Sequence, residues 1–157
     1  MSRVLALDFG TRRIGAALSD PTRRFASPLE VYERKSEQHD AAHYRRLVED
    51  EGVTRIVVGL PLHTSGDEGE SARLARAFGA WLANVTNVPI VFHDERYTSR
   101  MADEVLRTPG VKRKDRSARR DMIAANVLLQ SYLDAGCPES ELPAAPLADC
   151  EDTSCEP

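Results

Sequence analysis

Three acidic residues, Asp8, Glu95 and Asp121, stand where carboxylates could meet and bind a divalent cation. Asp8 ends the apolar run of residues 4–7 and precedes a glycine-containing turn, which is how a sheet presents a carboxylate at its edge. Glu95 follows another apolar run, at the carboxyl end of a strand, where open α/β sheets place their sites. The alternatives are a simple strand end for Asp8 and an ordinary polar loop for Glu95. Convergent carboxylates suit Mg²⁺ or Mn²⁺, and paired ions can activate water for phosphodiester hydrolysis.

Asp121 falls inside a helix that we expect over residues 115–133. Positions 118, 121, 125 and 128 share one face of that helix, so the carboxylate lies on the buried side. An unpaired charge there is costly, and a bound cation or a set of hydrogen-bond donors would offset the cost. A structural ion pair with Arg119 or Arg12 is the alternative explanation.

The spacing of apolar residues predicts the elements that position these acids. We expect an antiparallel meander of strands near 3–9, 13–19 and 24–32, then a helix over 36–51 that ends at Gly52. A strand over 55–59, a helix opened by a capping box at 65–68, and a strand over 88–92 follow. Strands that alternate with helices pair in parallel. The expected fold is α/β, with a five-stranded mixed sheet, an antiparallel meander plus two parallel strands, flanked by helices.

The composition is that of a globular protein followed by an acidic tail. The 157 residues, 41% of them hydrophobic, suit one domain over residues 1–134. No apolar stretch approaches the length of a membrane helix and no signal-peptide pattern opens the chain, so we expect a cytoplasmic protein. Residues 135–157 are acidic and proline-rich and hold all three cysteines, which form no C-x-x-C pair. We expect this tail to be disordered.

The charge is divided unevenly between the two parts. Seven of the 25 acids lie in residues 134–157, which contain no lysine or arginine, leaving 18 acids against 21 basic residues before them. The body is therefore near +3, although the chain as a whole carries −4. Six of the nine residues in 112–120 are basic, a block that is typical of a solvated helix start or of phosphate binding.

The chain resembles the YqgF/RuvX family of pre-16S rRNA nucleases, which is related to Holliday-junction resolvases of the RuvC type. The resemblance covers residues 3–134 and rests on four motifs in order: LDFGTRRIG at 7–15, VGLPL at 58–62 followed by Ser65 and Gly66, DERYTS at 94–99, and DMIAA at 121–125. It implies a ribonuclease H-like fold, with Asp8, Glu95 and Asp121 as catalytic metal ligands for Mg²⁺ or Mn²⁺.

The resemblance also implies a hydrolase that acts on structured RNA, at the 5′ end of pre-16S rRNA. The residues expected to contact this substrate are Thr11, Arg12, Arg96, Lys112, Arg113 and Lys114. A resolvase of branched DNA with the same chemistry, and a non-catalytic RNA-binding module, are the alternatives; a resolvase would need a symmetric dimer, whereas we expect a monomer or a weak homodimer. An actin- or sugar-kinase-like ATPase fits the Asp8 motif, but the chain is too short for its duplicated sheet.

Two other groups of residues are expected to take no part in the site. His39 and His43 lie four residues apart on a helix, as a metal pair could, but their polar neighbours indicate a solvated surface. Trp81 lies on the apolar stripe with Phe78 and Leu82 and is expected in the core rather than at a base-stacking surface.

Overall fold

The computed structural model describes residues 2–61, 69–94 and 113–138, with side chains described from residue 119 in the last segment. Five strands and three helices lie along these segments, three strands first and then helices alternating with the remaining strands. In chain order they are β1 (Arg3–Asp8), β2 (Arg13–Ser19), β3 (Ala26–Glu33), α1 (Glu37–Glu51), β4 (Val53–Leu60), α2 (Glu70–Thr86), β5 (Ile90–Asp94) and α4 (Arg113–Asp134). None of the described helices is long and apolar enough to cross a membrane.

The five strands form one mixed sheet in the order β3-β2-β1-β4-β5. β1, β2 and β3 pair antiparallel, whereas β4 pairs parallel with both β1 and β5. This is the predicted meander with two parallel strands added. The carboxyl ends of β1, β4 and β5 consequently lie at the same edge of the sheet.

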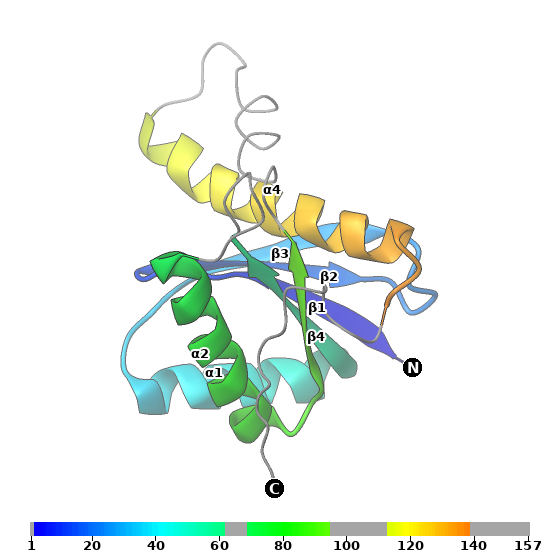
Figure 1. The fold of residues 1–157 in the computed structure, drawn as a ribbon, viewed down its shortest axis with the longest axis horizontal. Helices are drawn as coiled ribbons and strands as arrows, with labels where there is room; N and C mark the ends of the chain where they lie inside the picture. Colours follow the sequence, from blue (N-terminus) through cyan, green and yellow to red (C-terminus); the bar gives the residue numbers. More distant parts are fainter. Residues whose placement is uncertain (1, 62–68, 95–112, 139–157) are drawn as a thin grey trace, which may run out of the picture.

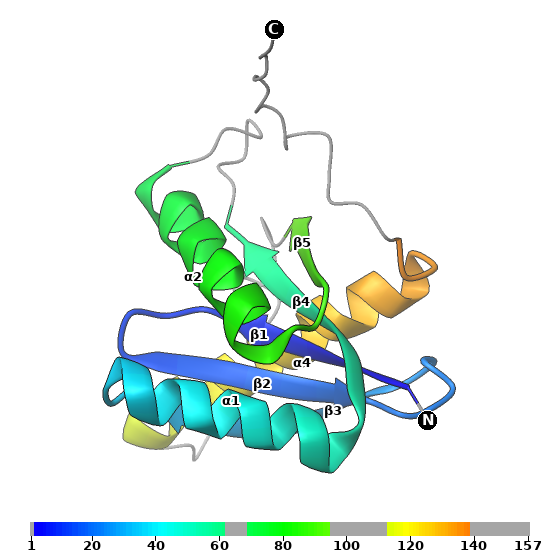
Figure 2. The same cartoon turned by 90° about the horizontal axis from the view of Figure 1, so that it is seen from below.

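Helices cover both faces of the sheet, with α1 and α2 on one side and α4 on the other (Figures 1 and 2). Successive side chains of a strand point to opposite faces, and each face has its own hydrophobic core. In β1, Leu5 and Leu7 pack with residues of α1 and α2, whereas Val4 and Ala6 pack with α4. Odd positions of β1 therefore face α1 and α2, and even positions face α4.

The ends of the first helix follow the predicted pattern. Ser36 caps α1 by accepting a hydrogen bond from the backbone N–H of His39. Gly52 ends α1 in the left-handed conformation, at φ 65°, and donates its N–H to the carbonyl of Val48. Glycine adopts this conformation at the least cost, so the position of Gly52 sets where α1 stops.

Three elements begin two or more residues later than predicted. The capping box at 65–68 lies outside the described residues, and α2 begins instead after Gly69, which supplies no side-chain cap. β5 begins at Ile90 rather than at residue 88, because Pro89 has no backbone N–H to donate to the ladder, although its carbonyl accepts a hydrogen bond from Ile56. β3 begins at Ala26, since Asp20 holds the preceding turn through the backbone N–H groups of residues 22, 24 and 25.

Candidate active site

Asp8, the last residue of β1, lies on the side of the sheet that α4 covers. It is two residues beyond Ala6 and four beyond Val4, both of which pack in the α4 core. Alternation along the strand therefore turns the Asp8 side chain toward α4. Across the ladder, Asp8 is paired with Gly15 of β2. Opposed residues of an antiparallel pair lie about 5 Å apart and share a face, so Gly15 also faces α4.

Gly15 is where the backbone of α4 touches the sheet. A Cβ atom placed on Gly15 would lie 2.1 Å from the carbonyl oxygen of Asp121 and 3.3 Å from the Asp121 Cβ. The helix can approach this closely only because Gly15 has no side chain. Asp121 thus sits directly over the strand partner of Asp8, and the two carboxylate residues are brought together on one face, at the carboxyl end of β1.

Asp121 is ion-paired with Arg13, the first residue of β2. Asp121 Oδ2 lies 3.2 Å from Arg13 Nε, and the Asp121 side chain remains 26% exposed. Burial raises the pKa of Asp121 above its usual value, and the charges of Arg13 and Arg120 oppose that rise. The ion pair that we considered therefore forms, but not with Arg12, which lies in the β1–β2 turn, nor with Arg119, which is exposed.

Glu95 lies outside the described residues, so its participation stays a prediction. β5 ends at Asp94, whose strand partner Leu60 packs in the core under α1 and α2. Among the described residues no group of three His, Cys, Asp or Glu side chains forms a metal site. Asp8 and Asp121 nevertheless supply hard carboxylate oxygens on one face, and that donor type fits Mg²⁺ or Mn²⁺.

The residues predicted to contact substrate do not all lie on the face of the acids. Thr11 and Arg12 are exposed in the β1–β2 turn and line a cleft on the opposite face, which α1 and α2 cover. Arg113 and Lys114 begin α4, although their side chains are outside the described part of the chain. Arg96 and Lys112 lie in segments that the structure does not describe.

The cleft has a volume of about 660 Å³ and lies between the β1–β2 turn, the β3–α1 connection and α2. Three of the side chains that line it form a row of rings: Phe9 and Phe78 have centroids 4.7 Å apart, and Phe78 and Trp81 5.8 Å apart. The Arg34 guanidinium lies 5.3 Å from the Phe9 centroid. Trp81, predicted to be core, packs against the core with one part of its surface and lines this cleft with another.

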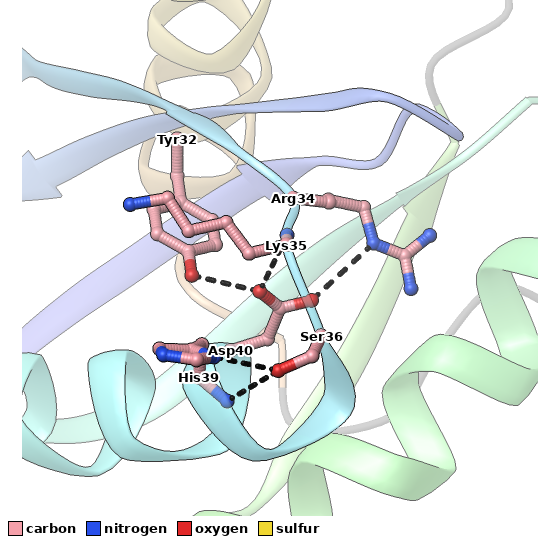
Figure 3. Close-up of polar contacts among 6 residues, drawn as sticks. All are labelled: Tyr32, Arg34, Lys35, Ser36, His39 and Asp40. Carbon is pink, nitrogen blue, oxygen red and sulfur yellow. Dashed lines mark hydrogen bonds and ion pairs between the residues drawn. The ribbon is translucent and has the colours of Figure 1, made fainter.

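Asp40 of α1 anchors the wall of the cleft that the β3–α1 connection forms (Figure 3). It is 4% exposed, and its Oδ1 accepts hydrogen bonds from the Tyr32 hydroxyl at 2.7 Å and the Lys35 backbone N–H at 3.1 Å. Its Oδ2 lies 3.7 Å from Arg34 Nε. Burial, together with the hydrogen bond and charge of Asp40, raises the pKa of Tyr32 to about 12. The ion pair with Asp40 orients Arg34 toward the aromatic row, and the two hydrogen bonds hold β3 and the β3–α1 connection to α1.

The histidines of α1 differ: His39 is exposed, as predicted, whereas His43 is half-buried and makes specific contacts, so the prediction of a solvated side chain was wrong for His43. His43 Nε2 lies 2.5 Å from Glu30 Oε2, and its ring stacks on Tyr32 with centroids 4.0 Å apart. His39 Nδ1 lies 2.7 Å from the hydroxyl of Ser36. These contacts join α1 to β3 and to its own N-cap, which is a structural role.

Known proteins match this chain over nearly all of the residues that the structure describes. The family model described as "RuvX: Holliday junction resolvase" matches residues 2–135. A protein of Chloroflexus aurantiacus named "Putative pre-16S rRNA nuclease" is 42% identical over 132 residues, covering 84% of this chain and 86% of the relative. Proteins of the same name from Koribacter versatilis and Rhodopirellula baltica are 43% and 40% identical and cover 84% and 85% of this chain, and 86% and 77% of the relatives.

Solved structures resemble the fold at low sequence identity. Thermus thermophilus RuvC in complex with a Holliday junction substrate matches with a TM-score of 0.53 at 14% identity, over 87% of this chain and 96% of that one. Fowlpox virus resolvase, also in complex with Holliday junction DNA, matches with a TM-score of 0.53 at 9% identity, over 87% and 99% of the two chains. These likenesses confirm a ribonuclease H-like fold.

Proposed function

Because the chain belongs to the RuvX family, we propose that it is a metal-dependent nuclease that processes the 5′ end of pre-16S rRNA in the cytoplasm. The observation that carries the proposal is the contact of Asp121 with Gly15, the strand partner of Asp8. It puts Asp121 next to the strand partner of Asp8, and this supports a site at the edge where sheets of this class place theirs. Relatives of about 40% identity that are named as nucleases support the same reaction class.

Asp8 and Asp121, with Glu95 as the third ligand, would hold one or two Mg²⁺ or Mn²⁺ ions. When bound, such an ion stabilises negative charge on a phosphodiester and makes water a stronger nucleophile. The chain's own contribution is to place the Arg13 guanidinium beside the Asp121 carboxylate, where its charge opposes the effect of burial, and to hold Asp121 against Gly15. Arg96 and the basic residues Lys112, Arg113 and Lys114 would bind the flanking phosphates, with an affinity that falls as salt rises.

A nuclease assay with matched variants tests this proposal. We expect the purified protein to cut precursor rRNA in Mg²⁺ or Mn²⁺ but not in EDTA, and Asp8→Asn and Asp121→Asn to lose at least about 100-fold in rate. Asp50→Asn, which removes an exposed acid of α1, should cut as fast as the parent protein. Cutting by Asp8→Asn at the parental rate would show that the chemistry lies elsewhere.

Resolution of branched DNA is the second candidate, because the matching family model is described as a Holliday junction resolvase. Two symmetric nicks require two active sites. Sizing the protein alone and with a four-way DNA junction, followed by mapping of the cuts, separates the candidates. A two-fold complex with paired cuts would favour the resolvase, and a monomer that cuts only RNA would favour the rRNA nuclease.

A binding module without activity would keep the fold while losing the metal site. Thermal melting in increasing Mn²⁺ distinguishes this case, since an ion that binds only the native state raises the Tm further as its concentration rises above its Kd. We expect the shift in the parent protein and its loss in Asp121→Asn. Absence of any shift, together with absence of cutting, would favour the binding module.

A further inference from the structure

The cleft beside Phe9 and Trp81 begins at the same edge of the sheet as the acidic site. Phe9 directly follows Asp8, and it packs against the core on the α1 and α2 side. Asp8 lies on the α4 side, so two successive residues open onto opposite faces at one edge. The β1–β2 turn, which carries Thr11 and Arg12, forms the rim between them.

The lining of the cleft suits a planar polar ligand better than a bare phosphate. Three basic residues are balanced by three acids: Arg12, Arg34, Lys35, Glu33, Glu37 and Asp40. The resulting charge is close to zero, which gives inorganic anions no advantage. The exposed carboxylates can accept hydrogen bonds from amino groups, and arginine can donate to ring nitrogens and carbonyl oxygens, as in base recognition.

The aromatic row supplies flat surfaces on which a planar ligand can stack. Phe9, Phe78 and Trp81 stand side by side, with the Arg34 guanidinium over the first two rings. Unpaired bases of single-stranded RNA stack on aromatic rings and on guanidinium planes. Arg34 is ion-paired with Asp40, which favours the position of its guanidinium beside the rings. In the described part of the chain, the Arg12 guanidinium makes no ion pair or hydrogen bond, which leaves its donors available at the rim.

From these observations we propose that the cleft binds an unpaired nucleobase of the RNA strand that crosses the sheet edge at the acidic site. The inference rests on the proposed function for the identity of that strand. It assigns Trp81 and Phe9 to stacking and Arg12 to hydrogen bonding with the base. The volume, about 660 Å³, lies within the range of sites for small ligands.

Trp81 is the only tryptophan of the chain, so its fluorescence reports on this cleft. The test titrates Asp8→Asn protein in EDTA with a ten-nucleotide single-stranded RNA, so that neither cutting nor metal binding contributes. We expect saturable quenching by the single strand, at least about tenfold weaker binding of the same sequence as a duplex, and none by inorganic phosphate. Equal or tighter binding of free adenosine monophosphate would overturn the assignment to an RNA strand.

Variants of the rim then test the residues. Arg12→Ala should weaken binding of the single strand about tenfold, and so should Leu74→Glu, which places a negative charge at a lining position that is 39% exposed. Arg24→Ala removes the same charge from the exposed β2–β3 turn and should leave the affinity within about twofold. An equal loss in Arg24→Ala would mean general electrostatic attraction and overturn the proposal.

Failure of this inference is distinguishable from failure of the proposed function. If the parent protein cuts RNA but the Trp81 fluorescence of Asp8→Asn does not respond to RNA, the nuclease function stands and the base site is refuted. Quenching that depends on Arg12, in a protein that cuts no RNA with either metal, supports the base site and refutes the nuclease.

Discussion

Folding and the proposed chemistry favour different protonation states of Asp121. Burial favours the neutral carboxyl group, whereas metal binding needs the charged carboxylate. Its burial raises its pKa, so the native state favours the protonated form, while Arg13 and Arg120 favour the charged form. Because the net direction is upward, burial outweighs the ion pair. A native pKa above the unfolded value means that the contribution of this group to stability is present below the unfolded pKa and is lost as the pH rises through the native pKa.

Asp121→Asn should therefore stabilise the metal-free protein at neutral pH while abolishing cutting. Urea unfolding in EDTA at several pH values between 3 and 8 measures this. The gain over the parent should be largest at neutral pH and should vanish below about pH 4, near the unfolded pKa. Asp50→Asn, on the exposed surface of α1, should show no such trend. A variant less stable than the parent at neutral pH would mean that the Arg13 pair outweighs burial.

Asp8 and Asp121 show which parts of this site could be predicted from the sequence. The identity of Asp8 follows from local signals, because an apolar run that ends in an acid before a glycine turn is visible in one short segment. The partner of Asp121 was not predicted, since Arg12 and Arg13 are adjacent and only strand alternation decides which one faces α4. Gly15 offered a signal that we did not use: a glycine inside a strand often marks the close approach of another backbone.

At the scale of elements, the packing of α4 on β2 depends on a backbone contact. Gly15→Ala should reduce the free energy of unfolding by about 3 kcal/mol, because the added methyl group would meet the carbonyl of Asp121. The same change should displace Asp121 and weaken Mn²⁺ binding. Urea unfolding and a metal titration measure the two effects.

Gly79→Ala is the matched control for that prediction. Its Cβ would lie 2.4 Å from an atom of the Phe92 ring, so it strains the contact of α2 with β5, which lies on the opposite face from α4. We expect a loss of stability without a change in Mn²⁺ affinity. If both variants altered metal binding alike, the displacement of α4 would not be the cause.

The connection between β3 and α1 depends on Asp40. Asp40→Ala should cost about 2 kcal/mol of stability, because the Tyr32 hydroxyl and the Lys35 N–H lose a buried acceptor. Asp50→Ala, at an exposed position of the same helix, should change stability by less than about 0.5 kcal/mol. Chemical unfolding of both variants measures the difference, and equal values would show that water replaces the carboxylate.

The elements themselves were predicted well where the signal is local. The limits of α1 follow from Ser36 and Gly52, which cap it through contacts within a few residues. The start of α2 was misplaced, because the sequence rule selects the pattern at 65–68, whereas α2 begins after Gly69, which has no side chain to signal a cap. The cleft was not predicted at all, since Phe9, Arg34 and Trp81 come from three segments that only the fold brings together.

At the scale of the whole molecule, the charge of the acidic tail is opposite in sign to the net charge of the body. A chain that ends at Pro138 loses six acids and keeps the carbonyls of Cys137 and Pro138, which accept hydrogen bonds from Arg55 and Tyr132. We expect an unchanged Tm and tighter RNA binding at low salt, with the difference shrinking as salt rises. Binding by the full chain that is as tight as that of the shortened chain in 50 mM salt would show that the tail does not compete.

The alternation of Asp8 and Phe9 also bears on how this protein folds. Side chains of a strand change sides at every residue, so a slip of β1 by one position would turn Asp8 toward α1 and α2 and Phe9 toward α4. Such a misregistered chain would keep much of its secondary structure and lose both the acidic site and the aromatic row. Recovery of cutting and of Trp81 quenching after refolding would therefore be a stricter measure of correct strand registration than recovery of the circular dichroism spectrum.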